Sequence, residues 1–103
     1  MSDDRLVLLV EFHAAPGRLE DLRRALLDVV GPTRDEPGCL LYDLHDDPAD
    51  PDHLVFYEIW ESAAAHAAHD ATTHIRSLVT LLPELTRDAP RMLRLRRIEP
   101  ATG

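Results

Sequence analysis

The sequence predicts a single α+β domain built on an antiparallel sheet, and three observations support this. Its 103 residues, of which 45% are hydrophobic and 29% charged, suffice for one compact domain with one modest core. Segments with the two-residue period of strands alternate with segments that have the period of helices. Glycine and proline stand between these segments, where turns are expected. We therefore interpret residues 1–103 as one domain, with a core from about residue 5 to residue 99.

The first half of the chain has the pattern of a strand, a helix and a second strand. The apolar segment Leu6–His13 is followed by a Pro-Gly pair, which predicts a strand and a turn. A helix is expected from Arg18, because apolar residues then recur every three or four positions, and Gly31-Pro32 should stop it. The second strand is predicted over residues 39–45, where three side chains point to one face: Leu40, Tyr42 and Leu44.

The second half of the chain repeats this pattern. The turn-rich residues 46–52 predict a long loop before a third strand over residues 53–61. Ser62 is the expected N-cap of a helix over residues 63–70, and more helix is expected over residues 74–82, before Pro83. The last strand is predicted over residues 91–99. The resulting order, βαββαβ, is that of a ferredoxin-like fold with an antiparallel sheet.

Both faces of the predicted strands are apolar, although the helices of one chain can cover only one face. In the first strand Leu6 and Leu8 lie on one face, and Val7 and Leu9 lie on the other. The third strand has the same two-sided pattern. Because a large uncovered apolar face is an interaction surface, we expect a homodimer in which two sheets pack against each other about a twofold axis.

The charge and composition of the chain argue against several partners. The chain has 11 arginines and no lysine against 19 acidic residues, and its formal net charge of -8 argues against nucleic acid. Its four glycines form neither a dinucleotide fingerprint nor a phosphate loop. The acidic N-terminus and the short apolar runs predict neither export nor a membrane span. The lone Cys39 excludes an internal disulfide, and we expect a cytoplasmic protein.

The histidines raise the question of a metal site. His66 and His69 lie one helical turn apart and can share a face. Their spacing matches no zinc motif, and residues 71–73 separate them from His74, so the three imidazoles have no evident reason to converge. The sequence therefore predicts no metal site. Hydrolysis is not expected either, because Ser62 and Ser77 lie in no nucleophile elbow.

Strand alternation places Glu58 between Phe56 and Trp60 on an apolar face. A carboxyl group there is either desolvated, with a raised pKa, or paired with an arginine. Its simplest role is that of a paired or hydrogen-bonded group at the dimer seam. Near the end of this strand lie aromatic and imidazole groups that can form an apolar pocket with a proton acceptor: Tyr42, Trp60, His69 and His74.

Three motifs in this part of the chain occur together in a known family. They are Glu36-Pro37-Gly38-Cys39 with Tyr42, the run Phe56-Tyr57-Glu58-Ile59-Trp60-Glu61-Ser62, and Ala65 with Ala68-His69 and Thr72-Thr73-His74. With them the chain, from about Leu6 to Ile98, resembles the antibiotic biosynthesis monooxygenase family. The resemblance implies a dimeric α+β barrel, in which two ferredoxin-like sheets close on each other.

The resemblance also implies an activity and a site. Members oxygenate quinols or phenolic polyketides with O2 and without flavin, haem or metal, so it implies a monooxygenase that needs no cofactor and no metal. In such chemistry a base deprotonates the bound phenol, whose ring then reduces O2 in a dry pocket. The implied catalytic residues are His74, His69 and Trp60, with either histidine as the base. The implied substrate pocket is lined by Tyr42, Phe56 and Glu58.

Three alternatives accompany this interpretation. Haem-degrading relatives have Asn, Trp and His at the positions of Val10, His69 and Val79, so haem degradation is not expected. A second branch resembles isomerases of a phosphorylated signalling sugar derivative, whose phosphate would need Arg76 or the arginines within residues 91–97. The third alternative is a non-catalytic, dimeric small-molecule-binding domain with the same fold.

Overall fold

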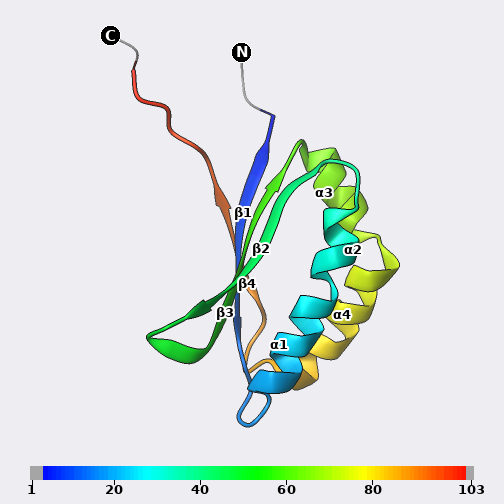
Figure 1. Ribbon diagram of the computed structural model, residues 1–103, viewed down its shortest axis with the longest axis vertical. Helices are drawn as coiled ribbons and strands as arrows, with labels where there is room; N and C mark the ends of the chain where they lie inside the picture. Colours follow the sequence, from blue (N-terminus) through cyan, green and yellow to red (C-terminus); the bar gives the residue numbers. More distant parts are fainter. Residues whose placement is uncertain (1–3, 102–103) are drawn as a thin grey trace.

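The computed structural model describes residues 4–101 and has the predicted order of elements (Figure 1). The strands are β1 (Leu6–His13), β2 (Cys39–Asp47), β3 (Asp50–Trp60) and β4 (Arg91–Leu95). The helices are α1 (Leu19–Asp28), α2 (Val30–Arg34), α3 (Ala63–Asp70) and α4 (Thr73–Leu85). The strands form one antiparallel sheet in the order β2-β3-β1-β4, and the helices cover one side of it. The structure thus confirms the α+β, ferredoxin-like fold.

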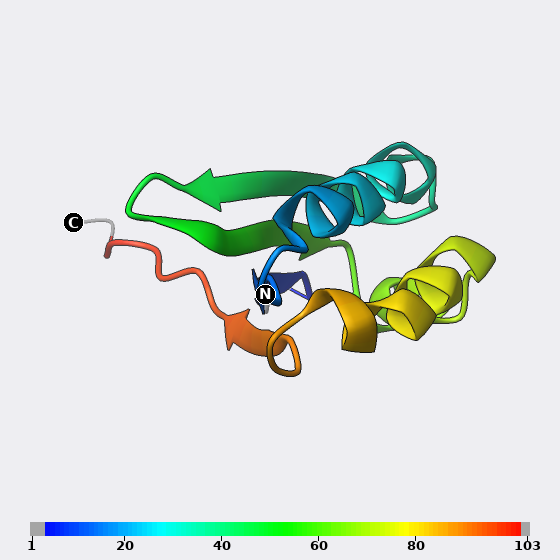
Figure 2. The ribbon, with the colours of Figure 1, turned by 90° about the horizontal axis from the view of Figure 1, so that it is seen from below.

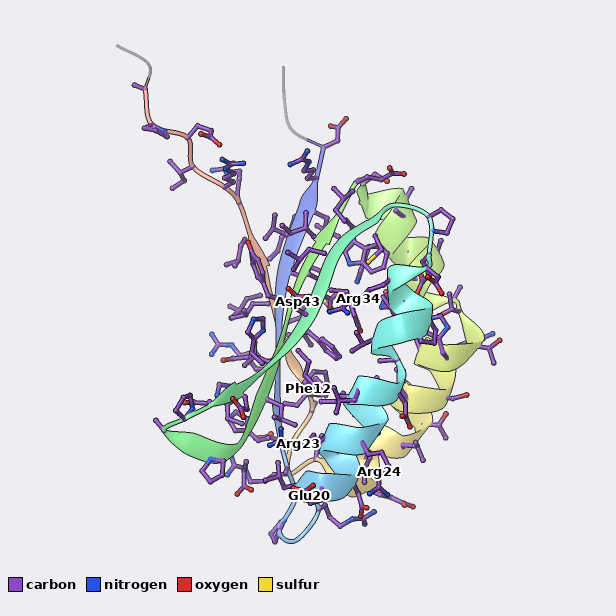
Figure 3. All side chains as sticks on the ribbon, in the orientation of Figure 1. Phe12, Glu20, Arg23, Arg24, Arg34 and Asp43 are labelled. Carbon is purple, nitrogen blue, oxygen red and sulfur yellow. The ribbon has the colours of Figure 1, made fainter. Side chains whose placement is uncertain are left out.

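The core lies between the sheet and the helices. Every second side chain is buried in β1 and, from Leu54 onward, in β3. Cross-strand pairing places Leu8 opposite Glu58 and Val10 opposite Phe56. The labelled Phe12 lies between the sheet and the helices (Figure 3). The helices contribute leucines and an isoleucine at helical spacing: Leu22, Leu26, Ile75, Leu78, Leu82 and Leu85.

The first helical region does not stop where the sequence predicts. Helix α1 ends at Asp28, and α2 begins at Val30 and contains Gly31-Pro32. The prediction was wrong because Pro32 lies in the first turn of α2, where a helix needs no backbone N–H donor. The break at Val29 redirects the chain, so that α2 continues toward the start of β2.

The loop predicted over residues 46–52 is instead a tight hairpin. Strands β2 and β3 extend through most of this stretch, and only Pro48 and Ala49 lie between them. The Asp47 side chain accepts a hydrogen bond from the Ala49 N–H (2.8 Å), which closes the turn locally. At the other end of β2 a register irregularity between Cys39 and Leu41 leaves Leu40 exposed, so Leu40 does not share the buried face of Tyr42 as predicted.

The C-terminal elements also differ in length from the prediction. Helix α4 continues past Pro83 to Leu85, whose buried side chain anchors its last turn. Strand β4 ends at Leu95, four residues before the predicted end at Glu99. The segment that follows leaves the sheet and runs away from the domain (Figures 1 and 2).

No helix of residues 4–101 lies against the second face of the sheet (Figure 2). Its side chains come from the alternate positions of the strands and are half-buried, among them Val7, Leu9, Val55, Tyr57 and Ile59. We call this surface the open face. Among the described residues, no helix is both long and apolar enough to cross a membrane.

Candidate active site

A cavity of about 160 Å³ lies between the helix-covered side of the sheet and helices α3 and α4. Most of its lining is apolar, with side chains from β1, β2, β3, β4 and α4. The polar and titratable groups in its wall are Tyr42, Glu58, His66, His69 and Asp70. A larger hollow, of about 240 Å³, lies at the open face, but its described lining contains no imidazole and no carboxyl group. Because its mostly apolar wall combines a phenol, two imidazoles and two carboxyl groups, the cavity of about 160 Å³ is the candidate active site.

Glu58 is a buried carboxyl group in the wall of this cavity. Its residue is only 3% exposed, and the Trp60 indole N–H donates a hydrogen bond to its Oε1 atom (3.0 Å). Burial raises the pKa of Glu58 to about 7, although this hydrogen bond opposes the rise. Of the two predicted possibilities, desolvation applies and an arginine partner does not. Glu58 also faces the helices and not the open face, and its predicted place at a dimer seam stays a prediction.

The turn that precedes β2 brings Glu36 to the end of helix α3. Arg34 fixes α2 to β2, because its guanidinium donates to the Tyr42 carbonyl (3.2 Å) and to the Asp43 carboxylate (2.8 Å; Figure 3). Gly38 has a positive φ of 82°, and a Cβ atom there would lie 2.6 Å from the Cβ atom of Ala65. A glycine is therefore required for the turn to pack against α3.

Glu36 accepts hydrogen bonds from two histidines on one carboxylate oxygen. Its Oε2 atom lies 2.9 Å from His69 Nδ1 and 2.8 Å from His74 Nε2. The side chains of Glu36, His69 and His74 are 11%, 4% and 24% exposed. Thr72 caps α4 with its hydroxyl and donates that hydroxyl to the His69 carbonyl (2.7 Å), which fixes the two histidines relative to each other. We call Glu36, His69 and His74 the Glu36 cluster.

His69 connects the Glu36 cluster to the cavity. Its ring lies in the cavity wall, 4.6 Å from the Trp60 ring and 5.5 Å from the Tyr42 ring between centroids. Burial lowers the pKa of His69, against the opposing effect of Glu36, so the ring is neutral near pH 7. The hydrogen bond to Glu36 assigns the proton to Nδ1, which leaves a lone pair on Nε2. Burial raises the pKa of the neighbouring Tyr42 hydroxyl.

Only some of the predicted site residues lie in the wall of the cavity. Tyr42, Phe56, Glu58 and His69 line the cavity together. The other two predicted catalytic residues lie outside the lining: Trp60 is fully buried beneath Glu58 and His69, and His74 binds Glu36 from the more exposed side.

The prediction that the histidines do not converge was wrong for His69 and His74. Their ring centroids are 6.3 Å apart, and Glu36 joins them. One donor atom from each of Glu36, His69 and His74 lies within 4.8 Å of the others, so these three residues have the spacing to hold a metal ion. Sequence reasoning assigned no role to Glu36, because it lies 33 and 38 positions before its partners. Its place beside a Pro-Gly turn at the start of a strand was the available signal.

Comparison with known proteins identifies the family of the chain. The family model for antibiotic biosynthesis monooxygenases matches residues 5–81. A crystal structure of a Pseudomonas aeruginosa protein has a TM-score of 0.89 and 34% identity, over 93% of this chain and 96% of that chain. A crystal structure described as an antibiotic biosynthesis monooxygenase has a TM-score of 0.85 and 32% identity, over 91% and 99%.

A curated relative from Synechocystis, described as an uncharacterised protein, is more distant. It is 27% identical over 84 residues, which are 82% of this chain and 57% of that protein. This chain thus spans little more than half the length of that relative.

Proposed function

Because the chain belongs to the antibiotic biosynthesis monooxygenase family, we propose that it oxidises a quinol or a phenolic, polyketide-like aromatic compound with O2 and without a cofactor. One observation supports this most directly: His69 lies in the wall of a mostly apolar cavity with one ring nitrogen held by Glu36. A neutral imidazole whose tautomer is fixed by a carboxylate is a suitable general base near neutral pH.

The proposed reaction begins with proton transfer from the substrate hydroxyl to His69 Nε2. The resulting phenolate is electron-rich, and its ring carbon gives electrons to O2 and forms a C–O bond to the peroxide. Cleavage of the O–O bond, with loss of the proton on that carbon, then forms a carbonyl and releases water. For a quinol the balance is quinol plus O2 to hydroxyquinone plus water, in which O2 accepts all the electrons that the substrate loses.

Glu58 is the proposed proton donor for the departing water. With a pKa of about 7 it is half protonated at neutral pH, and a donor of this strength suits proton transfer to a peroxide oxygen. The Trp60 indole holds the Glu58 carboxyl in place, so Trp60 is a positioning residue in this scheme. Tyr42 and Phe56 form the aromatic wall against which a planar substrate packs.

The size of the cavity favours a small substrate. An apolar cavity of about 150 Å³ is sufficient to hold benzene. The cavity between the sheet and α3 and α4 is of about 160 Å³, so a single-ring hydroquinone is the first substrate to test, and fused-ring quinols require the wall to open.

The phosphorylated-sugar alternative is not favoured. Among the described residues that line the cavity none is an arginine, and Arg76 and the strand 91–97 contribute no cationic side chain to it. Two carboxyl groups, Glu58 and Asp70, would instead repel a phosphate. The non-catalytic binding domain uses the same cavity and is distinguished only by the absence of turnover.

We test the proposed oxidation with an oxygen electrode and isotope labelling. With 1,4-hydroquinones the protein should consume O2 and incorporate one atom from labelled O2 into a hydroxyquinone product. Spontaneous oxidation gives a quinone and hydrogen peroxide instead, so a catalase control separates the two reactions. Quinol-induced thermal stabilisation without enzyme-dependent O2 uptake would contradict the proposal and favour a binding domain.

We also propose that the chain is a homodimer joined at the open face. The apolar, half-buried positions of β1 and β3 on this side support the proposal. Sedimentation equilibrium at micromolar concentration should give twice the mass of one chain. Val55→Asp, which places a charge in the middle of the open face, should give a monomer, whereas the exposed Leu27→Asp on α1 should leave the dimer intact. A wild-type monomer would contradict the proposal.

A further inference from the structure

We propose that Glu36, His69 and His74 bind one divalent transition-metal ion of the zinc class. The donor set consists of two imidazole nitrogens and one carboxylate oxygen, which is a set that zinc and neighbouring first-row metals prefer. The proposal stands apart from the oxidation proposed above, which uses the metal-free form of His69.

The Glu36 cluster groups three donor atoms of the kind that a metal site requires. Its three donor atoms lie within 4.8 Å of one another, and the two imidazole nitrogens are 2.9 Å and 2.8 Å from the same Glu36 oxygen. Ligands at zinc distances in a tetrahedron are separated by about 3.3 Å. To admit an ion, the two imidazole nitrogens, which lie within 4.8 Å of each other, must therefore approach by up to about 1.5 Å, and the Glu36 oxygen must move back by about half an ångström.

The protonation of the cluster is compatible with this exchange. Without an ion, Glu36 accepts the N–H groups of His69 Nδ1 and His74 Nε2. When an ion takes the place of these two protons, each imidazole binds it through the same nitrogen and carries its proton on the other ring nitrogen. His69 Nε2 is then protonated, so the metal-bound protein lacks the free nitrogen that the proposed oxidation uses. The Glu36 carboxylate supplies the negative charge that opposes the ion.

The position of the cluster gives an ion both an entrance and a rigid frame. His74 is 24% exposed, so the site reaches the surface, while Glu36 and His69 are nearly buried. The Thr72 hydroxyl lies 3.4 Å from His74 Nε2 and donates to the His69 backbone, which fixes the spacing of the two ligands. The remaining coordination position is left for water.

The other carboxylate–imidazole contacts of the described residues lack this arrangement. His53 has one ring nitrogen beside Asp47 and the other beside Glu11, so these carboxylates lie on opposite sides of one ring. His66 lies 3.8 Å from Asp70, with no second imidazole donor grouped with this pair. The Glu36 cluster differs from these two contacts because its three donor atoms converge on one point.

Equilibrium dialysis with Zn2+ tests the proposal in the absence of any quinol. Untagged wild-type protein, first treated with a chelator, should take up one Zn2+ per chain at micromolar concentration. Co2+ should give the intense visible absorption of a tetrahedral site. Glu36→Gln and His74→Ala should each weaken binding by at least about tenfold. The matched control His66→Ala removes a neighbouring imidazole outside the cluster and should bind as the wild type does.

Folding is checked separately, because Glu36 and His69 are nearly buried. Circular dichroism of each variant should match that of the wild type, and Zn2+ should raise the melting temperature of the wild type and of His66→Ala only. Wild-type uptake below a tenth of an equivalent would overturn the proposal. So would unchanged binding in folded Glu36→Gln and His74→Ala, which would assign the ion to another place.

Discussion

Two carboxylate–imidazole clusters lie on opposite faces of the same sheet. They differ in whether one ring nitrogen of the histidine has no carboxylate beside it. In the Glu36 cluster His69 uses one ring nitrogen for Glu36 and has the rest of its ring in the cavity wall. On the open face, His53 lies between Asp47, 2.9 Å from Nδ1, and Glu11, 3.2 Å from Nε2. Its ring also stacks on His13, with 4.7 Å between centroids. We call this second group the His53 cluster.

The difference shows that the placement of the carboxylates decides what an imidazole can do. The hydrogen bond with Asp47 raises the pKa of His53 and favours its cation, and a carboxylate oxygen lies beside each ring nitrogen. Burial lowers the pKa of His69 and favours its neutral form, with one nitrogen unengaged by Glu36. The His53 cluster is therefore suited to joining β1, β2 and β3, and the Glu36 cluster is suited to proton transfer.

The largest expected effect is a loss of activity that a substitution in the Glu36 cluster should cause and a substitution in the His53 cluster should not. His69→Gln should lower quinol-dependent O2 uptake by about 100-fold or more, because a general base contributes this much or more to rate. The matched variant His53→Gln should retain most of the activity, since its ring lies on the other face of the sheet. Equal losses in both would remove the functional distinction between the clusters. Full activity in a folded H69A/H74A double variant would exclude both histidines as the base.

The next largest effect is the pH dependence of stability that Glu58, in the cavity beside the Glu36 cluster, should cause. The pKa of Glu58 rises from 4.5 to about 7 on burial, and the negative charges of Asp70 and Glu36 add to the rise. The folded state therefore keeps a proton that the unfolded chain loses, and wild-type stability should fall as the pH rises from about 5 to 8. Between these pH values the free energy of unfolding of the wild type should fall by about 2 to 3 kcal/mol more than that of Glu58→Gln.

Urea unfolding of both proteins at pH 5 and pH 8 measures this difference. The Gln side chain keeps the shape of Glu58 and its acceptor for the Trp60 N–H, so it removes only the titration. Parallel pH dependences of the two proteins would mean that Glu58 does not carry the raised pKa.

Much of the fold was predictable because β1 and β3 have unambiguous local patterns. Their two-residue period grouped Leu6 to Phe12 on one face, and likewise the residues up to Trp60, but it did not indicate which face the helices cover, because both faces are apolar. The errors occurred where tertiary packing overrode a local signal. Pro32 was interpreted as a helix stop but lies in a helix's first turn, and the register irregularity that exposes Leu40 has no signature in the residues themselves.

The site was predictable only in part, for a similar reason. Strand alternation placed Glu58 and Trp60 on one side, and the position of His69 in the helix that follows β3 placed it near them. Glu36 was missed because its contact with His69 and His74 depends on how closely the turn at Gly38 approaches α3. That approach is a property of the packed structure, and no periodicity along the chain indicates it.

The smallest expected effect tests the His53 cluster as a structural element. Since the pKa of His53 is raised, its stabilising contribution is complete below about pH 6.5 and is lost as the pH rises through the folded-state value. The melting temperature of the wild type should exceed that of His53→Gln by more at pH 6 than at pH 9, with a change of about 3 °C or less, because the cluster is partly exposed to water. His45→Gln, an exposed position on β2, is the control and should show no such change. If the difference between wild type and His53→Gln is instead independent of pH, His53 contributes only as a neutral ring stacked on His13, and the contrast with His69 in charge state fails.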